Sequence, residues 1–82
     1  MGYLAVDSLS DGIVEKVCVH EGAFVYEWEP LFFIRTPNGA VKKVELGASG
    51  IVSKVHVTQG ERVCIQMTLA VLEEDTSPTG CD

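Results

Sequence analysis

Short runs of β-branched and apolar residues recur along the chain, and glycine-containing turns separate them. The clearest runs are residues 13–19 and 51–57, and a second strong run follows each of them at 31–35 and 69–72. Runs of this composition and length, bounded by turn residues, predict β-strands. No window keeps the i, i+3, i+4, i+7 apolar spacing of a helix. The pattern therefore predicts an all-β protein.

The sequence also repeats itself. Residues 11–34 align with residues 49–72 without a gap, an offset of 38 positions (49 − 11). The identical pairs are Gly12/Gly50, Ile13/Ile51, Val14/Val52, Lys16/Lys54, Val17/Val55, Val19/Val57, Gly22/Gly60, Val25/Val63 and Leu31/Leu69. A unit this small cannot bury its own apolar face, so we expect the two units, at about 3–37 and 41–75, to pack together around a pseudo-two-fold axis.

Two local features refine the expected strands. Polar Glu15 and Ser53 interrupt the alternation at equivalent positions, which indicates a shared β-bulge or sheet edge. Asn38-Gly39 lies between two β-rich runs, at the junction of the units, and Asn-Gly is typical of a two-residue hairpin with a type I′ turn. We therefore expect a hairpin at 36–40 that protrudes between the two units.

The resulting fold prediction is a flattened β-barrel or sandwich. About eight short strands would form two small four-stranded antiparallel sheets with an internal quasi-two-fold repeat. At 82 residues the chain has room for a single domain, which we place at residues 1–75. Residues 76–82 contain Ser, Pro, Thr and Gly beside acidic residues and are expected to form a flexible acidic tail.

Charge and cysteine content narrow the possible partners. The chain has 6 Lys and Arg against 12 Asp and Glu, a net charge of −6 that repels phosphate backbones and anionic lipid surfaces. Nucleic acid and membrane are therefore not expected partners, and no apolar run is long enough to span a bilayer. The three cysteines Cys18, Cys64 and Cys81 have no close spacing. Free thiols in a reducing cytoplasm are the simpler interpretation, and no secretory signal opens the chain.

At this point the chain resembles a known family. The pattern Gly-Ile-Val-x-Lys-Val-x-Val-x-x-Gly-x-x-Val, followed by Glu29-Pro30-Leu31, a hairpin and a second Gly-Ile-Val, is similar to biotinyl/lipoyl carrier domains. The resemblance covers about residues 3–73 and implies a barrel-sandwich of two four-stranded sheets. It also implies that a lysine in the exposed hairpin accepts biotin or lipoate and carries groups between active sites.

The sequence departs from the family at that hairpin. Asn38 or Gly39 occupies the position of the acceptor lysine, and neither supplies the amine nucleophile that amide formation requires. Lys42 and Lys43 follow in the descending strand and are the fallback acceptors. The other interpretation of these two lysines is that they are solvated charges that discourage edge-to-edge strand pairing. We therefore expect no covalent biotin or lipoate at the tip.

Other candidate chemistry is sparse. Cys18, His20, His56 and Cys64 are the soft ligands of the predicted folded part, but no Cys-x-x-Cys or His-x-x-x-His spacing supports a zinc site. No third group is placed to orient a Cys-His catalytic pair. No metal site and no catalytic residue is predicted from these four side chains.

Aromatic residues gather in the first unit. They are Phe24, Tyr26, Trp28, Phe32 and Phe33. The second unit has non-aromatic residues at the equivalent positions: Arg62, Cys64, Gln66, Ala70 and Val71. We assign Phe24 and Phe33 to the core. Trp28 lies in a Glu-Trp-Glu turn that is difficult to bury, and with Tyr26 or Phe32 it could form an exposed anchor of the kind that nucleates protein interfaces.

These observations predict a non-catalytic, biotinyl/lipoyl-like domain that acts as a protein-interaction or accessory module. The expected partner is a protein: a carboxylase, acyltransferase or ligase component, or a second copy of the chain. The alternative is a working biotin or lipoyl carrier of a carboxylase or 2-oxoacid dehydrogenase-type complex, with Lys42 or Lys43 modified. A third interpretation is an adaptor of the kind found in export pumps, which the absence of a signal and of a flanking coiled coil disfavours.

Overall fold

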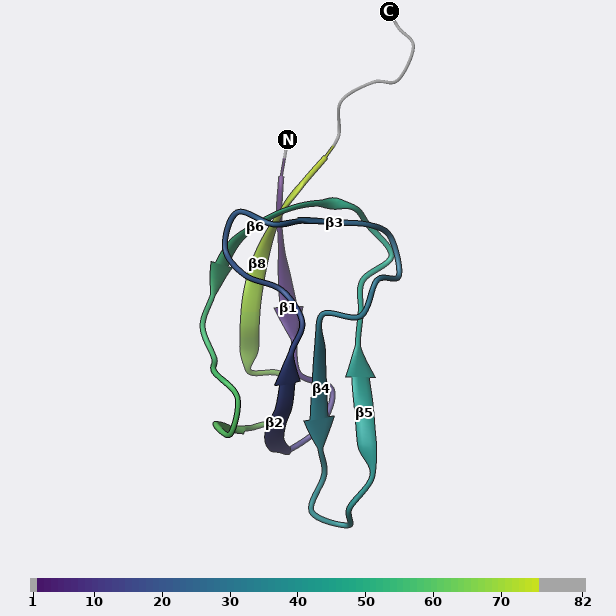
Figure 1. Cartoon of the computed structure of the whole chain (residues 1–82), viewed down its shortest axis with the longest axis vertical. Coiled ribbons are helices and arrows are strands. Elements are labelled where there is room, and N and C mark those ends of the chain that lie inside the picture. The colour runs from purple at the N-terminus through teal and green to yellow at the C-terminus, as the bar shows by residue number, and fades with distance from the viewer. Residues whose placement is uncertain (1, 76–82) are drawn as a thin grey trace, which may run out of the picture.

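The computed structural model describes residues 2–75. They form two four-stranded antiparallel sheets packed as a sandwich, with no helix among them (Figure 1). The first sheet has the order β1 (Tyr3–Asp7), β8 (Thr68–Glu74), β6 (Gly50–Val55), β3 (Phe24–Val25). The second has the order β5 (Val41–Val44), β4 (Phe32–Arg35), β2 (Gly12–Val17), β7 (Arg62–Val63). The predicted all-β class with two four-stranded antiparallel sheets is confirmed, whereas the expected tail at 76–82 lies outside the described residues.

Each sheet takes two strands from each half of the chain. The strands of the two halves correspond as β1 to β5, β2 to β6, β3 to β7 and β4 to β8. Exchanging each strand for its counterpart converts the order of the first sheet into that of the second. The loop hydrogen bonds correspond in the same way. The Gly22 amide donates to the Val52 carbonyl at 2.8 Å, and the Gly60 amide donates to the Val14 carbonyl at the same distance. The two halves are thus interleaved rather than placed side by side.

The core lies between the sheets and is built from the inward-facing residues of every strand. Alternation along the strands accounts for it: in β2, for example, Val14 is buried while Ile13 and Lys16 are exposed. The buried apolar residues are Val6, Val14, Val25, Leu31, Phe32, Ile34, Val44, Val52, Val57, Val63, Leu69, Ala70 and Leu72. Such a layer is what an 82-residue chain can bury, and it leaves the outer faces of both sheets to solvent.

The bulge predicted at Glu15 and Ser53 is confirmed. The register between β2 and β4 shifts between Val14 and Lys16, and the register between β6 and β8 shifts between Val52 and Lys54. In each case the polar residue is the extra one, which has no partner in the facing strand. The bulge lets one strand keep its buried valine inside while the alternation restarts beyond the polar residue.

The hairpin at 36–40 forms as expected, but its turn is not type I′. That turn needs positive φ at both Asn38 and Gly39, and of the two only Gly39 has it, with φ of 89°. The Gly39 amide donates to the Thr36 carbonyl at 2.9 Å, and the Thr36 amide donates to the Ala40 carbonyl at 2.8 Å. This is a three-residue loop in which a turn with Pro37 in its second position is followed by a left-handed glycine. Pro37 favours this arrangement because its ring fixes a negative φ at the first central residue.

Candidate functional site

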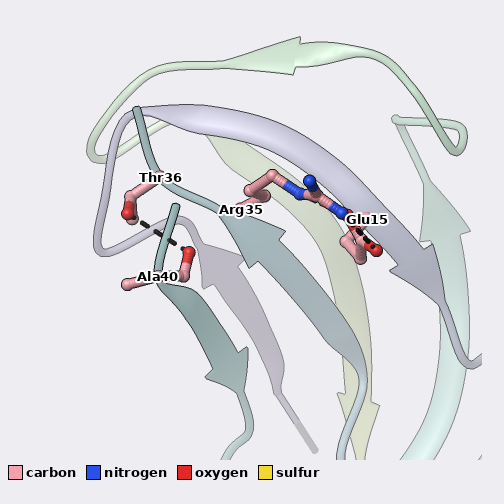
Figure 2. Close-up of polar contacts among 4 residues, drawn as sticks. All are labelled: Glu15, Arg35, Thr36 and Ala40. Carbon is pink, nitrogen blue, oxygen red and sulfur yellow. Dashed lines mark hydrogen bonds and ion pairs between the residues drawn. The ribbon is translucent and has the colours of Figure 1, made fainter. Parts of the chain in front are cut away.

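The hairpin tip uses its polar groups to close its own loop. The Thr36 hydroxyl donates to the Ala40 carbonyl at 3.2 Å (Figure 2). The same hydroxyl bonds to the Asn38 side-chain oxygen, to which the Ala40 amide also donates at 3.3 Å. Asn38 and Gly39 are both exposed. The position expected for an acceptor lysine is thus presented to solvent, and it carries an amide that caps the turn.

The two fallback lysines lie in β5 and differ in their surroundings. The Lys43 ammonium is 3.3 Å from a Glu45 carboxylate oxygen, an exposed ion pair. Lys42 lines a shallow cleft beside the hairpin together with Thr36, Asn38 and Ala40. Lys42 is therefore the lysine that the fold places next to the tip.

Three exposed aromatic side chains, which we call the aromatic surface, come from the segment around β3. This strand lies at the opposite end of the molecule from the hairpin (Figure 1). This aromatic surface consists of Phe24, Tyr26 and Trp28, which come from β3 and the loop that follows it. The rings of Phe24 and Tyr26 meet edge to face with centroids 5.0 Å apart. Tyr26 is 70% exposed and Trp28 is 59% exposed. Large apolar side chains grouped in solvent mark interaction sites.

The loop holds Trp28 in an unusual backbone conformation. Its φ is 65°, in the left-handed region that bulky residues rarely adopt. A four-residue turn fixes it: the Glu29 amide donates to the Tyr26 carbonyl at 3.1 Å, and the Tyr26 amide donates to the Glu29 carboxylate at 2.8 Å. The Trp28 amide donates to the Leu46 carbonyl at 2.7 Å. The backbone at Trp28 is thus held by its own turn and by the neighbouring loop.

Gly47 provides the support on which the indole rests. A Cβ atom added at Gly47 would lie 2.7 Å from one ring carbon of Trp28 and 2.8 Å from another. Only a residue without a side chain permits this approach. Part of the indole therefore packs on the Gly47 backbone, while Trp28 as a whole stays exposed.

Three of the aromatic assignments made from sequence are wrong, those of Phe32, Phe24 and Phe33. Phe32 was an expected member of the exposed anchor, but it is completely buried, between Val17 and Val44 in the adjacent strands. Phe24 was assigned to the core, but it is 41% exposed on the outer face of β3. Only one ring of Phe32-Phe33 can face inward, and the strand register decides which one. The bulge at Glu15 shifts the register between β2 and β4. Phe33 is only partly buried, opposite Lys16 and Lys43.

The soft ligands are scattered. Cys18 and Cys64 are exposed free thiols, and each follows the end of a different strand. His20 and His56 are also exposed. Among residues 2–75 no group of three His, Cys, Asp or Glu side chains is placed to hold a metal ion. Cys81 lies outside the described residues.

Sequence reasoning missed a cleft on the second sheet whose charged lining residues are two arginines and Asp11. It has a volume of about 610 Å³ and is lined by Ile13, Arg35, Pro37 and Arg62, among others. The Arg35 guanidinium donates to both carboxylate oxygens of Glu15, at 2.8 and 2.9 Å (Figure 2). The Arg62 guanidinium forms no hydrogen bond or ion pair with residues 2–75. These residues are distant in sequence, and only the strand register brings them together.

No protein-family model and no curated protein matches the chain. Within residues 2–75 there is no helix of the length and apolar character needed to cross a bilayer.

Proposed function

We propose that this protein is a non-catalytic, biotinyl/lipoyl-like domain that binds a protein partner through the aromatic surface of Phe24, Tyr26 and Trp28. The conformation of Trp28 is the observation that carries the proposal. A left-handed backbone costs a residue with a side chain about 1–2 kcal/mol, and here the chain accepts that cost in order to hold an indole in solvent. Glycine or asparagine would fill the same turn without strain.

The chemistry around the aromatic surface indicates the kind of partner. Glu27 is exposed beside Trp28, and Glu29 closes the same turn with its carboxylate. Aromatic side chains with an acidic border fit an apolar pocket that has basic residues at its rim. By the resemblance to carrier domains, the partner is a carboxylase, acyltransferase or ligase component, on which such domains dock.

A binding comparison between matched variants tests the proposal. Trp28→Ser should weaken capture of the partner from host lysate by about tenfold or more, because a central aromatic anchor contributes about 2 kcal/mol or more. Ile65→Ser is the control: Ile65 is 59% exposed, as Trp28 is, and lies in the corresponding loop of the second half. The captured protein must also bind the purified domain directly and must release it as salt concentration rises. Equal capture by both variants would overturn the proposal.

One observation favours a second candidate, a working carrier. Lys42 lies beside the hairpin tip, and its ammonium forms no ion pair with residues 2–75. In that function Lys42 would accept biotin or lipoate in an amide bond, the cofactor then being covalent. The intact mass of the protein from its own host distinguishes the two: an increase that Lys42→Arg abolishes and Lys43→Arg does not would establish the carrier.

A further inference from the structure

The outer faces of the two sheets carry matching rows of side chains with opposite charge. Across the first sheet, strand pairing places four residues in register, which we call the acidic row: Tyr3, Glu73, Ile51 and Phe24. Across the second sheet it places the four equivalent residues in register, which we call the basic row: Val41, Arg35, Ile13 and Arg62. Every member of one row lies 38 positions from its counterpart in the other (41 − 3, 73 − 35, 51 − 13, 62 − 24).

Both rows face solvent. Exposed side chains at Tyr3, Ile51, Phe24 and Ile13 alternate with buried or partly buried residues along their strands. Val41 is also exposed, at the start of a strand whose first three residues all face solvent. Glu73 follows the fully buried Leu72 and is partly exposed. Its carboxylate forms no ion pair with residues 2–75. Each row therefore combines apolar area with a charge that can still accept a partner.

The shapes of the rows differ. Ile13, Arg35 and Arg62 of the basic row line the cleft of about 610 Å³, and Pro37 of the hairpin lines it with them. In the acidic row, the Phe24 ring is braced edge to face by Tyr26 and stands on the outer face of β3. A braced aromatic ring on one face and an apolar cleft with two guanidinium groups on the other are complementary in form.

From this complementarity we infer that the acidic row of one molecule docks on the basic row of a second copy of the same chain. Equivalent positions face one another: Glu73 meets Arg35, Ile51 meets Ile13, and Phe24 meets the guanidinium of Arg62. The three contacts are an ion pair, an apolar contact and a cation–π contact. Arg35 donates two of its N–H groups to Glu15, so Glu73 would bind the remaining donors and complete a carboxylate–guanidinium–carboxylate arrangement.

The orientation follows from geometry. For two equivalent faces to meet, one molecule must be turned over about the axis of its row. The strands that cross the two rows then run in opposite directions. Lys54, beyond Ile51, then lies toward Asp11, which precedes Ile13. The reversed orientation would instead set Glu73 against Ile13 and Arg35 against Ile51, with both charges desolvated and unpaired, which is costly. Packing two acidic rows together sets Glu73 either against the Glu73 of the second molecule or against its Ile51, and neither arrangement neutralises the carboxylate.

This contact is heterologous, because it uses a different surface on each molecule. Each bound copy still presents one free row, so the association is open-ended and grows with concentration. It shares Phe24 with the aromatic surface of the proposed function, but Trp28 belongs to neither row. Loss of partner binding by Trp28→Ser would therefore leave self-association in place.

A charge-rescue experiment on the full chain tests the inference. Sedimentation velocity under reducing conditions, from about 10 µM to 1 mM protein, should show a mass that rises with concentration and falls with added salt. Phe24→Arg should weaken association by about tenfold or more, because Arg then opposes Arg62. The second half already carries arginine at the equivalent position, so the strand tolerates it. Arg62→Glu should also weaken association, whereas Lys42→Glu, with the same charge change, should not.

Combining Phe24→Arg with Arg62→Glu should restore association, because the two new charges attract across the contact. Phe24 and Arg62 lie on different sheets of one molecule, so a rescue requires contact between molecules. A monomer at every concentration overturns the inference. Self-association that persists in both single variants also overturns it. The same holds if the double variant associates no more strongly than the weaker of the two single variants.

Discussion

Trp28 and Gln66 occupy the same place in the two halves of the molecule and hold the same backbone conformation, with φ of 65° and 69°. The Trp28 amide donates to the Leu46 carbonyl, and the Gln66 amide donates to the Ser8 carbonyl, each at 2.7 Å. Both positions would suit glycine, yet one carries an indole and the other an amide. The fold thus imposes the conformation, and the side chain at each position is chosen for another reason.

This pair leads to a stability prediction. At both positions the glycine variant should be more stable than the alanine variant, with a free energy of unfolding about 1 kcal/mol higher. The reason is that a Cβ atom is strained at positive φ. Urea denaturation of Trp28→Gly, Trp28→Ala, Gln66→Gly and Gln66→Ala measures the difference. Tyr26 is the control, because its φ is not positive. Tyr26→Ala should therefore be at least as stable as Tyr26→Gly. The same ordering at Tyr26 as at Trp28 would contradict the argument.

Gly47 should control the position of the indole. Gly47→Ala places a methyl group within about 3 Å of the ring carbons, so the ring must swing into solvent. Trp28 is the chain's single tryptophan, so its fluorescence reports the change directly. We expect a red-shifted emission maximum in Gly47→Ala. Gly39→Ala is the comparison: it should lower stability, because Gly39 has positive φ, without moving the emission.

Two glycines that lie close to the backbone of a neighbouring strand should be intolerant of any side chain. A Cβ atom at Gly12 would lie 2.2 Å from the Arg35 carbonyl oxygen, and one at Gly50 would lie 2.1 Å from the Glu73 carbonyl oxygen. Backbone atoms in neighbouring strands cannot yield as a side chain can, so either alanine variant should lose about 3 kcal/mol or more. Gly2→Ala, with open space around it, should leave the denaturation midpoint unchanged. A midpoint near wild type for Gly12→Ala would show that the strands can separate.

An amine restored at the hairpin tip should test the resemblance to carrier domains. Asn38 is exposed and its φ is not positive, so Asn38→Lys should fit the loop. Co-expressed with biotin or lipoate ligase, this variant should gain the mass of one cofactor amide, since it supplies the missing nucleophile. The wild-type chain, produced in the same way, is the control. No mass gain, with the ligase active on a known acceptor domain, would count against the resemblance at the tip.

The Glu15–Arg35 ion pair should contribute little to folding. Its side chains are 39% and 56% exposed, and solvent screening limits such pairs to about 1 kcal/mol or less. Glu15→Gln should therefore shift the free energy of unfolding by less than about 1 kcal/mol. A larger loss would indicate that the bulge at Glu15 depends on the carboxylate.

The repeat made much of the fold predictable. Matching glycines and valines 38 residues apart located the main strands, and the mid-strand polar residues located the bulges. Pairing between halves was harder to foresee, because nothing local specifies which strands become neighbours. The Phe32 error has the same origin: in Phe32-Phe33 a shift of one position exchanges the buried ring for the exposed one. The turn at Asn38 was misjudged because Pro37 favours a longer loop than Asn-Gly alone.

The candidate site was only partly visible in the sequence. Tyr26 and Trp28 could be picked out because a Glu-Trp-Glu turn resists burial. The basic row could not, since its members come from four strands and acquire meaning only through register. The support of the indole by Gly47 also depends on a contact between distant loops.

The interleaving of the halves bears on how such a domain could arise and be divided. Neither half owns a complete sheet, since each sheet needs two strands from the other half. A chain cut in the hairpin would give two fragments, each with every strand next to an absent neighbour. Such fragments should find one another and reassemble when mixed. By the same logic, an ancestral gene encoding one half could have worked as a pair of identical chains, with the hairpin added later as the link that joined them.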